Sequence, residues 1–222
     1  EAFLVGRRSR EIPDRGLQKE CSLEDMAAYI RDEKEAMFLD RVNVFVNASD
    51  LPPDVQIVDL PGISVPNPRH KRLTYQFVTR DAHAIVFVLR STQLFSEDEL
   101  DLLEKIRAGD SSIAEKTFWV INRWDALTDE HSRDSTIANF RERMREANIS
   151  DTYALLKTNA RHGLLSQLAL RGEVPSDPKL QSQCREYENA LPTLYGNDHN
   201  KAFQDSEIPQ LQRDVLYYLN HR

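Results

Sequence analysis

Short apolar runs alternate with longer amphipathic segments along the chain. The runs are rich in Val, Ile, Leu and Phe and have the length of β-strands, so each predicts one strand. The most continuous run, residues 84–89, predicts a central parallel strand buried on both faces of a sheet. Residues 42–46 and 55–59 are separated by a turn with two prolines, which predicts an antiparallel pair. The predicted strands are residues 2–6, 42–46, 55–59, 84–89, 116–121 and 153–157.

Between these runs, apolar residues recur at the spacing that places them on one face of a helix. Ser22 with Asp25, and Ser96 with Glu99, have the residue types and spacing of helix N-terminal capping pairs. Pro209 falls in the first turn of the last predicted helix, where proline is tolerated. The predicted helices are residues 22–36, 70–80, a segment after Ser96, 132–147, 178–190 within a polar insertion, and a segment after Ser206.

The predicted strand 55–59 ends on residues suited to hold a phosphate. Asp59 and Gly62 have Asp-x-x-Gly spacing. In open α/β sheets, ligands bind at the carboxyl ends of the strands. There a carboxylate can hold Mg²⁺ through a water, and a glycine amide can approach a terminal phosphate closely. Asp59 and Gly62 are therefore candidate catalytic residues, and Asp59 is the candidate Mg²⁺ residue; the alternative is a simple turn at the end of the strand.

The predicted strand 116–121 is followed by a second polar pair. Asn122 and Asp125 have Asn-x-x-Asp spacing, in which a carboxylate can accept both N–H groups of a guanine edge. Adenine lacks that pair of donors, so the carboxylate discriminates against it. Asp125 has an alternative interpretation as the N-cap of the next helix, because aspartate is a favoured cap. We interpret Trp124 as a core residue and His162 as a surface histidine.

Composition narrows the class of protein. The chain has 222 residues, 40% of them hydrophobic, which suits one globular domain. A net charge of -7 argues against a surface that binds nucleic acid or an anionic membrane. No apolar run approaches the roughly 20 residues that span a bilayer. Cys21 and Cys184 lack the spacing of a metal or redox pair, so we expect two reduced thiols in a cytosolic protein.

The two motifs together resemble a known family. Asp59-Leu60-Pro61-Gly62, followed by Asn122-Arg123-Trp124-Asp125, is similar to the GTPase domain of the dynamin superfamily, and to bacterial dynamin-like proteins in particular. The resemblance runs from about residue 54 to residue 163, and more loosely to the last helix. It implies an α/β fold with a mostly parallel central sheet and helices on both faces, the P-loop GTPase fold of dynamin type, over residues 1–222.

The resemblance also implies further contacts with the nucleotide. Arg123 stands where the family usually has lysine, and its planar guanidinium can still cover a purine face. Asn159-Ala160-Arg161 resembles the family's last nucleotide motif, with Asn159 in place of serine and a backbone amide near Ala160 donating to the guanine carbonyl. Asn122, Arg123, Asp125, Asn159, Ala160 and Arg161 are therefore the candidate nucleotide-binding residues.

One motif of the family does not occur in the chain. The Gly-x-x-x-x-Gly-Lys-Ser/Thr loop that cradles phosphates is found nowhere in residues 1–222. We therefore expect a GTPase domain that is incomplete at its N-terminus, lacking the first strand and the phosphate loop. A fragment of this kind should show negligible GTP turnover by itself.

The resemblance implies a function for the intact protein, with GTP as substrate and Mg²⁺ as cofactor. We expect a dynamin-like GTPase that couples hydrolysis to self-assembly and membrane remodelling. It would be cytoplasmic and peripheral to a membrane, form a homo-oligomer or a nucleotide-dependent dimer, contact the membrane through other regions, and bind no nucleic acid. Two alternatives stay open: a degenerate GTPase-like assembly module without catalytic activity, and a GTPase outside the dynamins.

Overall fold

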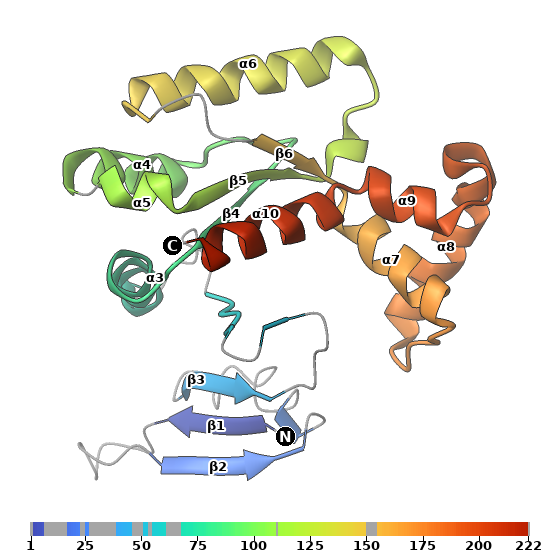
Figure 1. Cartoon of the computed structure of the whole chain (residues 1–222), viewed down its shortest axis with the longest axis horizontal. Helices are drawn as coiled ribbons and strands as arrows, with labels where there is room; N and C mark the ends of the chain where they lie inside the picture. Colours follow the sequence, from blue (N-terminus) through green and yellow to red (C-terminus); the bar gives the residue numbers. More distant parts are fainter. Residues whose placement is uncertain are drawn as a thin grey trace. The chain divides into compact units, whose positions relative to one another are not determined.

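The computed structural model divides the chain into two compact units, residues 1–58 and 59–222. Figure 1 shows the helices and strands of each unit. The structure describes residues 2–6, 17–22, 25–26, 39–45, 51–52, 55–60, 68–109, 111–149 and 155–221.

The first unit contains a small antiparallel sheet with strand order β2-β1-β3. Its central strand β1 pairs with both neighbours, Leu4 lying opposite Lys19 on one side and Val42 on the other. The predicted strand 2–6 is confirmed as β1, and the strand predicted at 42–46 is found as β3, which begins and ends earlier. Ser22 Oγ accepts the Asp25 N–H at 3.1 Å, as the capping pair predicts. The strands are β1 (Ala2–Gly6), β2 (Leu17–Cys21) and β3 (Leu39–Val44).

Residues 55–60 do not form the predicted strand. The predicted antiparallel pairing of 42–46 with 55–59 is also wrong, because β3 pairs with β1 instead. A strand requires a neighbour for its backbone N–H and C=O groups, and neither of the two described sheets takes up this segment. The one turn contact here joins Val55 N–H to the Pro52 carbonyl at 3.0 Å.

The second unit is built on a parallel sheet with strand order β4-β5-β6, to which helices pack. The strands are β4 (Ile85–Arg90), β5 (Thr117–Asn122) and β6 (Leu155–Thr158). The helices are α3 (Pro68–Arg80), α4 (Glu97–Gly109), α5 (Ser111–Glu115), the 3-10 turn η1 (Trp124–Ala126), α6 (Glu130–Glu146), α7 (Ala160–Arg171), α8 (Pro178–Tyr195), α9 (His199–Asp205) and α10 (Ile208–Asn220).

Helices cover both faces of β5. Successive side chains on a strand point to opposite faces. Trp119 is fully buried, and its ring lies 6.0 Å from that of Phe140 on α6. Its neighbour Phe118 meets Tyr218 of α10 edge to face at 5.5 Å. The predicted α/β fold, with a mostly parallel sheet and helices on both faces, is therefore confirmed for this unit.

The place of β4 in the sheet differs from the prediction that residues 84–89 form a central strand. In the described sheet β5 is central, whereas β4 pairs with β5 alone. Val86 and Val88 of β4 are 43% and 54% exposed, so this strand is not buried on both faces. A continuous apolar run indicates that a strand is hydrophobic, but it does not specify which strands pair with it.

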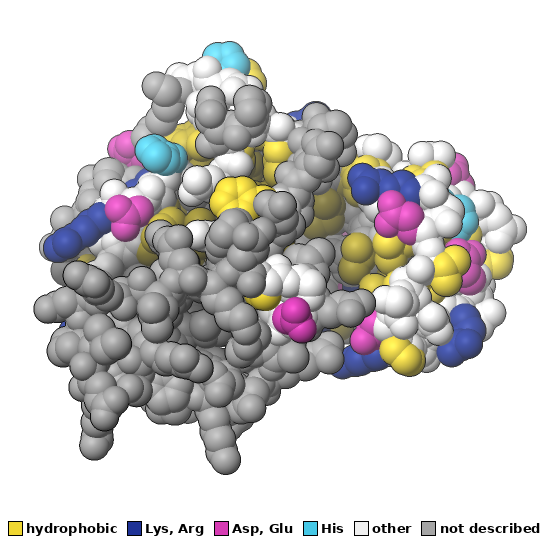
Figure 2. Space-filling view, turned by 90° about the horizontal axis from the view of Figure 1, so that it is seen from below, with side chains coloured by type: hydrophobic (Ala, Val, Ile, Leu, Met, Phe, Trp, Pro, Cys, Tyr) yellow, Lys and Arg dark blue, Asp and Glu magenta, His cyan; other side chains and the backbone are white. Residues whose placement is uncertain are grey.

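Helices α7, α8 and α9 form a second small core of their own (Figure 1). Leu165 of α7, Tyr187 and Leu191 of α8 and Ala202 of α9 are buried together. The predicted short helix at 178–190 is longer, because α8 extends to Tyr195. Side chains of both charges lie beside each other over this part of the surface (Figure 2).

Among the described residues, no helix is both long enough and apolar enough to cross a bilayer.

Candidate functional site

The carboxyl ends of the three parallel strands meet at one edge of the sheet. In the register of the sheet, Arg90 of β4 lies beside Asn122 of β5, and Asn122 lies beside Thr158 of β6. This alignment brings the Asn-x-x-Asp motif after β5 next to the Asn159-Ala160-Arg161 motif after β6. The two sequence motifs that were predicted to read the base are therefore neighbours in space.

The side chain of Asn122 joins these two motifs directly. Its Oδ1 accepts the backbone N–H of Ala160 at 3.0 Å and the hydroxyl of Thr158 at 3.3 Å. Thr158 is 1% exposed, so the contact closes over the end of β6. Polar groups that are shielded from water require a hydrogen-bond partner, and Asn122 provides one to both groups. Asn122 therefore holds the loop between β6 and α7 against the end of β5.

The start of α7 is positioned by Asn159. Its side-chain Oδ1 accepts the His162 N–H at 3.2 Å and so caps the helix. Its own N–H donates to the Ser206 carbonyl at 3.1 Å. Because the Ala160 N–H already donates to Asn122, the Arg161 N–H is the first-turn amide without a hydrogen-bond partner among the described residues. Arg161 is therefore the amide best placed to donate to a ligand carbonyl.

A close packing contact holds the same helix from the opposite direction. A Cβ on Gly163 would lie 2.9 Å from both Ile208 Cγ1 and Ser206 Oγ. Real Cβ atoms do not approach other atoms that closely, so only glycine allows α7 to lie this near to the start of α10. The first turn of α7 is thus fixed by β5 through Asn122 and by the chain before α10.

The turn after β5 has an unusual backbone conformation. Arg123 has φ 62° and ψ 40°, in the left-handed region that few residues other than glycine adopt. Ser91, which follows β4, donates its hydroxyl to the Arg123 carbonyl at 2.6 Å and its N–H to the Asn122 carbonyl at 3.0 Å. These two bonds stabilise the turn, and the exposed Arg123 side chain lies at the edge of the motif.

Asp125 lies in the 3-10 turn η1 with its side chain exposed. It is not the cap of α6, because Asp129 has that role: its Oδ1 accepts the Ser132 N–H at 2.8 Å. The hydrogen bonds from Ser132 lower the pKa of Asp129. Trp124 packs against the main core, the buried cluster that includes Leu89, Trp119 and Phe140. This confirms its interpretation as a core residue. Asp125 is therefore a carboxylate at the sheet edge with no structural role as a helix cap.

His162 is not the surface histidine that we expected. Its ring is half-buried, and its Nδ1 lies 2.7 Å from the hydroxyl of Tyr195 on α8. Burial lowers the pKa of His162, and the negative charge of Asp125 acts in the opposite direction. Arg161, one residue earlier, forms an exposed ion pair with Glu186 of α8 at 2.6 Å. Pairs of this kind contribute little stability but fix an orientation.

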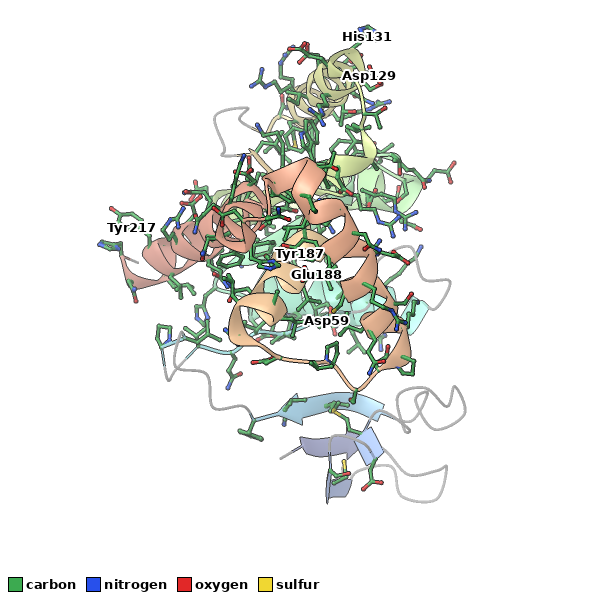
Figure 3. All side chains as sticks on the ribbon, turned by 90° about the vertical axis from the view of Figure 1, so that its right-hand side faces the viewer. Asp59, Asp129, His131, Tyr187, Glu188 and Tyr217 are labelled. Carbon is green, nitrogen blue, oxygen red and sulfur yellow. The ribbon has the colours of Figure 1, made fainter. Side chains whose placement is uncertain are left out.

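Of the two residues predicted to hold a phosphate, Asp59 and Gly62, the structure describes Asp59 alone. Asp59 is exposed, and the adjacent Leu60 packs against the main core, so Asp59 lies at the surface of the second unit (Figure 3). In the described part of the chain, no hydrogen bond or ion pair joins Asp59 to Asn122 or to its partners Thr158 and Ala160. Gly62 lies outside the described residues. The described residues also contain no cluster of three metal-binding side chains; a single carboxylate suits Mg²⁺, which keeps most of its waters.

Some residues of this site were missed by the sequence analysis. Thr158 is the last residue of β6, and its position in register with Asn122 was the signal that could have identified it. Ser91 and Tyr195 have no local motif around them. They come close to the site only because the ends of β4 and α8 reach the same edge of the molecule.

Replacing Asn122 with alanine should destabilise the chain by about 1 to 3 kcal/mol, because the Ala160 N–H and the Thr158 hydroxyl would then lose their acceptor. Urea unfolding followed by circular dichroism measures this free energy. Asn220→Ala, at the exposed end of α10, is the matched control and should change stability by less than about 0.5 kcal/mol. Equal effects of the two substitutions would contradict the linking role of Asn122.

Comparison with known proteins identifies the relatives of this chain. The model of the dynamin family matches residues 5–124, from the end of β1 through β5, and ends one residue before Asp125. Over 109 residues the chain is 28% identical to "Dynamin-like protein A" of Bacillus subtilis (strain 168), covering 49% of this chain and 9% of that protein. Over 124 residues it is 29% identical to "Probable transmembrane GTPase FZO-like, chloroplastic" of Arabidopsis thaliana, covering 56% of this chain and 13% of that protein.

The chain thus aligns with about a tenth of the length of each of these relatives. No solved structure matches it significantly. The family model covers more than half of the chain and spans both the Asp-x-x-Gly motif and the Asn122 end of β5. On this evidence, the chain belongs to the dynamin family.

Proposed function

We propose that the protein binds GTP with Mg²⁺ and hydrolyses it to GDP and phosphate. The observation that carries the proposal is the 3.0 Å hydrogen bond from the Ala160 N–H to Asn122 Oδ1. This bond links the Asn122 motif to the Asn159-Ala160-Arg161 motif, although the two bonded residues are 38 positions apart. Both motifs thus lie at one edge of the sheet, where Asp125 is exposed. One of the relatives is itself named a GTPase, and that name supports the same reaction here.

At this edge the guanine would be read by groups of complementary geometry. The Asp125 carboxylate accepts the two N–H groups of the base, and a first-turn amide of α7, Arg161 in this geometry, donates to the guanine carbonyl. The Arg123 guanidinium covers a face of the purine. Adenine offers Asp125 no such pair of donors, so a site built for hydrogen bonds rejects it strongly.

On the phosphate side, Asp59 would bind Mg²⁺ through a water and the Gly62 amide would contact the terminal phosphate. Mg²⁺ neutralises the charge that develops on the phosphoryl group, and phosphoryl transfer depends chiefly on such positioning and neutralisation. Residues 62–69 would serve as the switch segment that responds to that phosphate, as in other GTPases. This cycle would drive self-assembly or nucleotide-dependent dimerisation. The protein would be cytoplasmic and peripheral to a membrane. It would contact that membrane through other regions and remodel it.

A second candidate function is favoured by one observation. The phosphate-cradling Gly-x-x-x-x-Gly-Lys-Ser/Thr motif is absent from residues 1–222. A protein that lacked it throughout would be a GTPase-like assembly module without catalytic activity. A Gly-Lys-Ser or Gly-Lys-Thr preceding residue 1 in the full-length protein favours the enzyme, and its absence there favours the module.

Nucleotide binding and turnover of the full-length protein test the proposal. Fluorescent GDP should bind, GTP should displace it, and ATP should not. Phosphate release from GTP should require Mg²⁺ and stop when the metal is chelated. Binding without turnover would favour the assembly module. Equal displacement by ATP and GTP would contradict the guanine site.

Asp59→Asn should lower the Mg²⁺-dependent rate of GTP hydrolysis about 10- to 100-fold, since an amide holds a metal-bound water more weakly than a carboxylate does. GDP binding in the absence of Mg²⁺ should change less than about threefold, because Asp59 is not expected to touch the base. Phosphate release and fluorescent-GDP titration measure the two effects. Asp101→Asn, an exposed aspartate on α4, is the matched control and should behave as wild type.

A further inference from the structure

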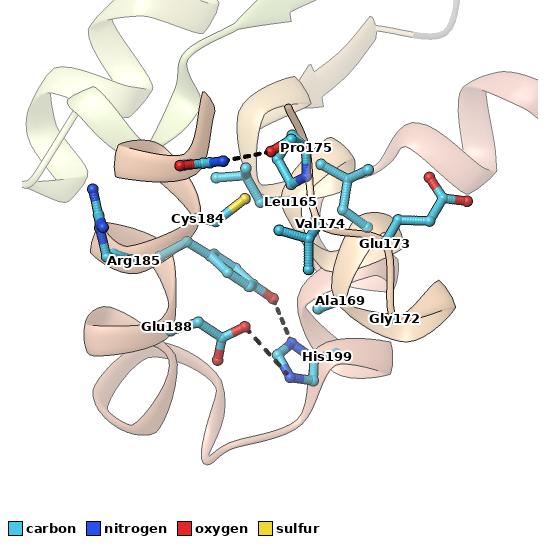
Figure 4. A pocket seen from close by; sticks show the side chains of 13 residues that line it. Leu165, Ala169, Gly172, Glu173, Val174, Pro175, Cys184, Arg185, Glu188 and His199 are labelled. Carbon is cyan, nitrogen blue, oxygen red and sulfur yellow. Dashed lines mark hydrogen bonds and ion pairs between the residues drawn. The ribbon is translucent and has the colours of Figure 1, made fainter. Parts of the chain in front are cut away.

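A row of aromatic and histidine side chains connects the base edge to the interior of α7, α8 and α9. Tyr195 contacts His162 through its hydroxyl at 2.7 Å. The His162 ring lies 5.7 Å from that of Tyr187, whose hydroxyl is 3.2 Å from His199 Nδ1. His199 in turn lies 3.9 Å from Glu188. The row ends at a cavity of about 510 Å³, which is lined by residues of these helices, such as Leu165, and by Val174 of the segment between α7 and α8 (Figure 4).

His162 is the member of this row that reaches the nucleotide edge. It stands in the first turn of α7, two residues after Ala160, and its own N–H is held by Asn159. Tyr195, by contrast, is the last residue of α8, which is anchored in the second core through Tyr187 and Leu191. The His162–Tyr195 contact, together with the Arg161–Glu186 ion pair, therefore joins the start of α7 to α8.

Asp125 acts electrostatically on both members of the contact. Its charge raises the pKa of His162, although burial, the larger effect, lowers it and Arg161 lowers it further. Burial, Asp205 and Asp125 raise the pKa of Tyr195. Burial chiefly raises the pKa of Tyr187 to about 12. Both tyrosines thus stay neutral at pH 7, and His162 is mainly neutral there too.

We propose that His162 and Tyr195 are positioning residues of the guanine edge, which tie the affinity for guanine nucleotide to α8 and to pH. This inference rests on the proposed function. With neutral His162, the Asp125 carboxylate is free to accept the two N–H groups of guanine. Protonated His162 carries a positive charge that attracts that carboxylate, competes with the base for it, and alters the hydrogen bond that holds α8. The start of a helix also disfavours a cation, which helps to keep His162 neutral.

The sign of the pH effect follows from these charges. The groups that face His162 are Asp125 on η1, Arg161 on its own helix, and Tyr187 and Tyr195 on α8. His162 is the imidazole among them, and an imidazole gains its charge as the pH falls through this range. Because its pKa lies below the usual 6.5, the cation forms on acidification, and guanine affinity should fall as the pH decreases through that range.

The test is a titration of the full-length protein with fluorescent GDP at pH 7.5 and at pH 5.5. Tyr195→Phe keeps the ring but removes the hydroxyl, and it should weaken GDP binding about fivefold at pH 7.5, the effect of one net hydrogen bond. His162→Asn keeps a polar atom near the position of Nδ1 that can bond Tyr195 but does not titrate. It should weaken GDP binding less than Tyr195→Phe does at pH 7.5, and it should lose less affinity than wild type when the pH falls to 5.5.

Tyr217→Phe is the matched control, because Tyr217 is 66% exposed at the outer end of α10 (Figure 3). It should reproduce wild type at both pH values, including the change caused by titration of the GDP phosphate itself. If Tyr195→Phe also matches wild type, or if His162→Asn keeps the full acidic loss, the inference is wrong while the proposed function stands. If wild type does not bind GDP at either pH, the proposed function fails and this inference fails with it.

Discussion

In the Asp125→Asn variant of the full-length protein, GTP binding should weaken about 100-fold, and xanthosine triphosphate should become the preferred ligand. In the proposed site the carboxylate accepts two hydrogen bonds from guanine, and each bond to a charged group is worth roughly 1.5 to 3 kcal/mol. Asparagine accepts one of them and presents an N–H to the other donor. Xanthine has a carbonyl in place of the guanine amino group, so its edge complements the amide.

Competition between GTP and xanthosine triphosphate for bound fluorescent GDP measures this exchange. Asp134→Asn, an exposed aspartate on α6, makes the same chemical change away from the sheet edge and should leave the preference for GTP unaltered. An unchanged preference in Asp125→Asn would show that Asp125 does not read the base, and the guanine site would have to lie elsewhere.

Trp119→Ala should lower the free energy of unfolding by about 3 to 5 kcal/mol, the cost of removing a large aromatic side chain from a core. Trp119 is fully buried, with 0% of its surface accessible to solvent. Its ring lies 5.1 Å from that of Phe87 and 6.0 Å from that of Phe140. It lies at the centre of β5, so its loss loosens the strand that ends in Asn122. Chemical unfolding of the chain followed by circular dichroism measures the effect.

Trp119→Phe separates packing from hydrogen bonding. In the described part of the chain the buried indole Nε1 of Trp119 has no hydrogen-bond partner. Phenylalanine therefore forfeits no polar contact and keeps most of the ring area, and it should cost less than half as much as alanine. An equal loss from both substitutions would indicate that the indole N–H has a partner, for example an ordered water.

Much of the second unit could be predicted because the signals are local. Apolar runs identified β5 and β6, and the register of the sheet agrees with the polar residues that end them. The capping pair at Ser96 is confirmed, since Glu99 accepts the Ser96 N–H at 2.6 Å. A capping bond spans three residues and a helical face spans a few turns, so the chain specifies both within a short window.

The predictions that failed all concern partners that are distant in the sequence. Residues 55–59 are apolar enough for a strand, but neither described sheet pairs with them. Residues 84–89 are the most apolar run, yet β4 pairs only with β5 in the described sheet. His162 has no sequence signal for burial, because the tyrosine that covers it stands 33 residues later.

The sequence by itself determined the family, the α/β pattern of the second unit, and the residue types that can read a guanine, because motif spacing and hydrophobic periodicity are properties of short segments. Only the tertiary structure decided that Asn122 meets Ala160 and that Tyr195 meets His162. Those contacts arise where parallel strands end in register and a helix packs back against them. The physical reason is that side-chain hydrogen bonds depend on positions in space, which many separate packing contacts determine together.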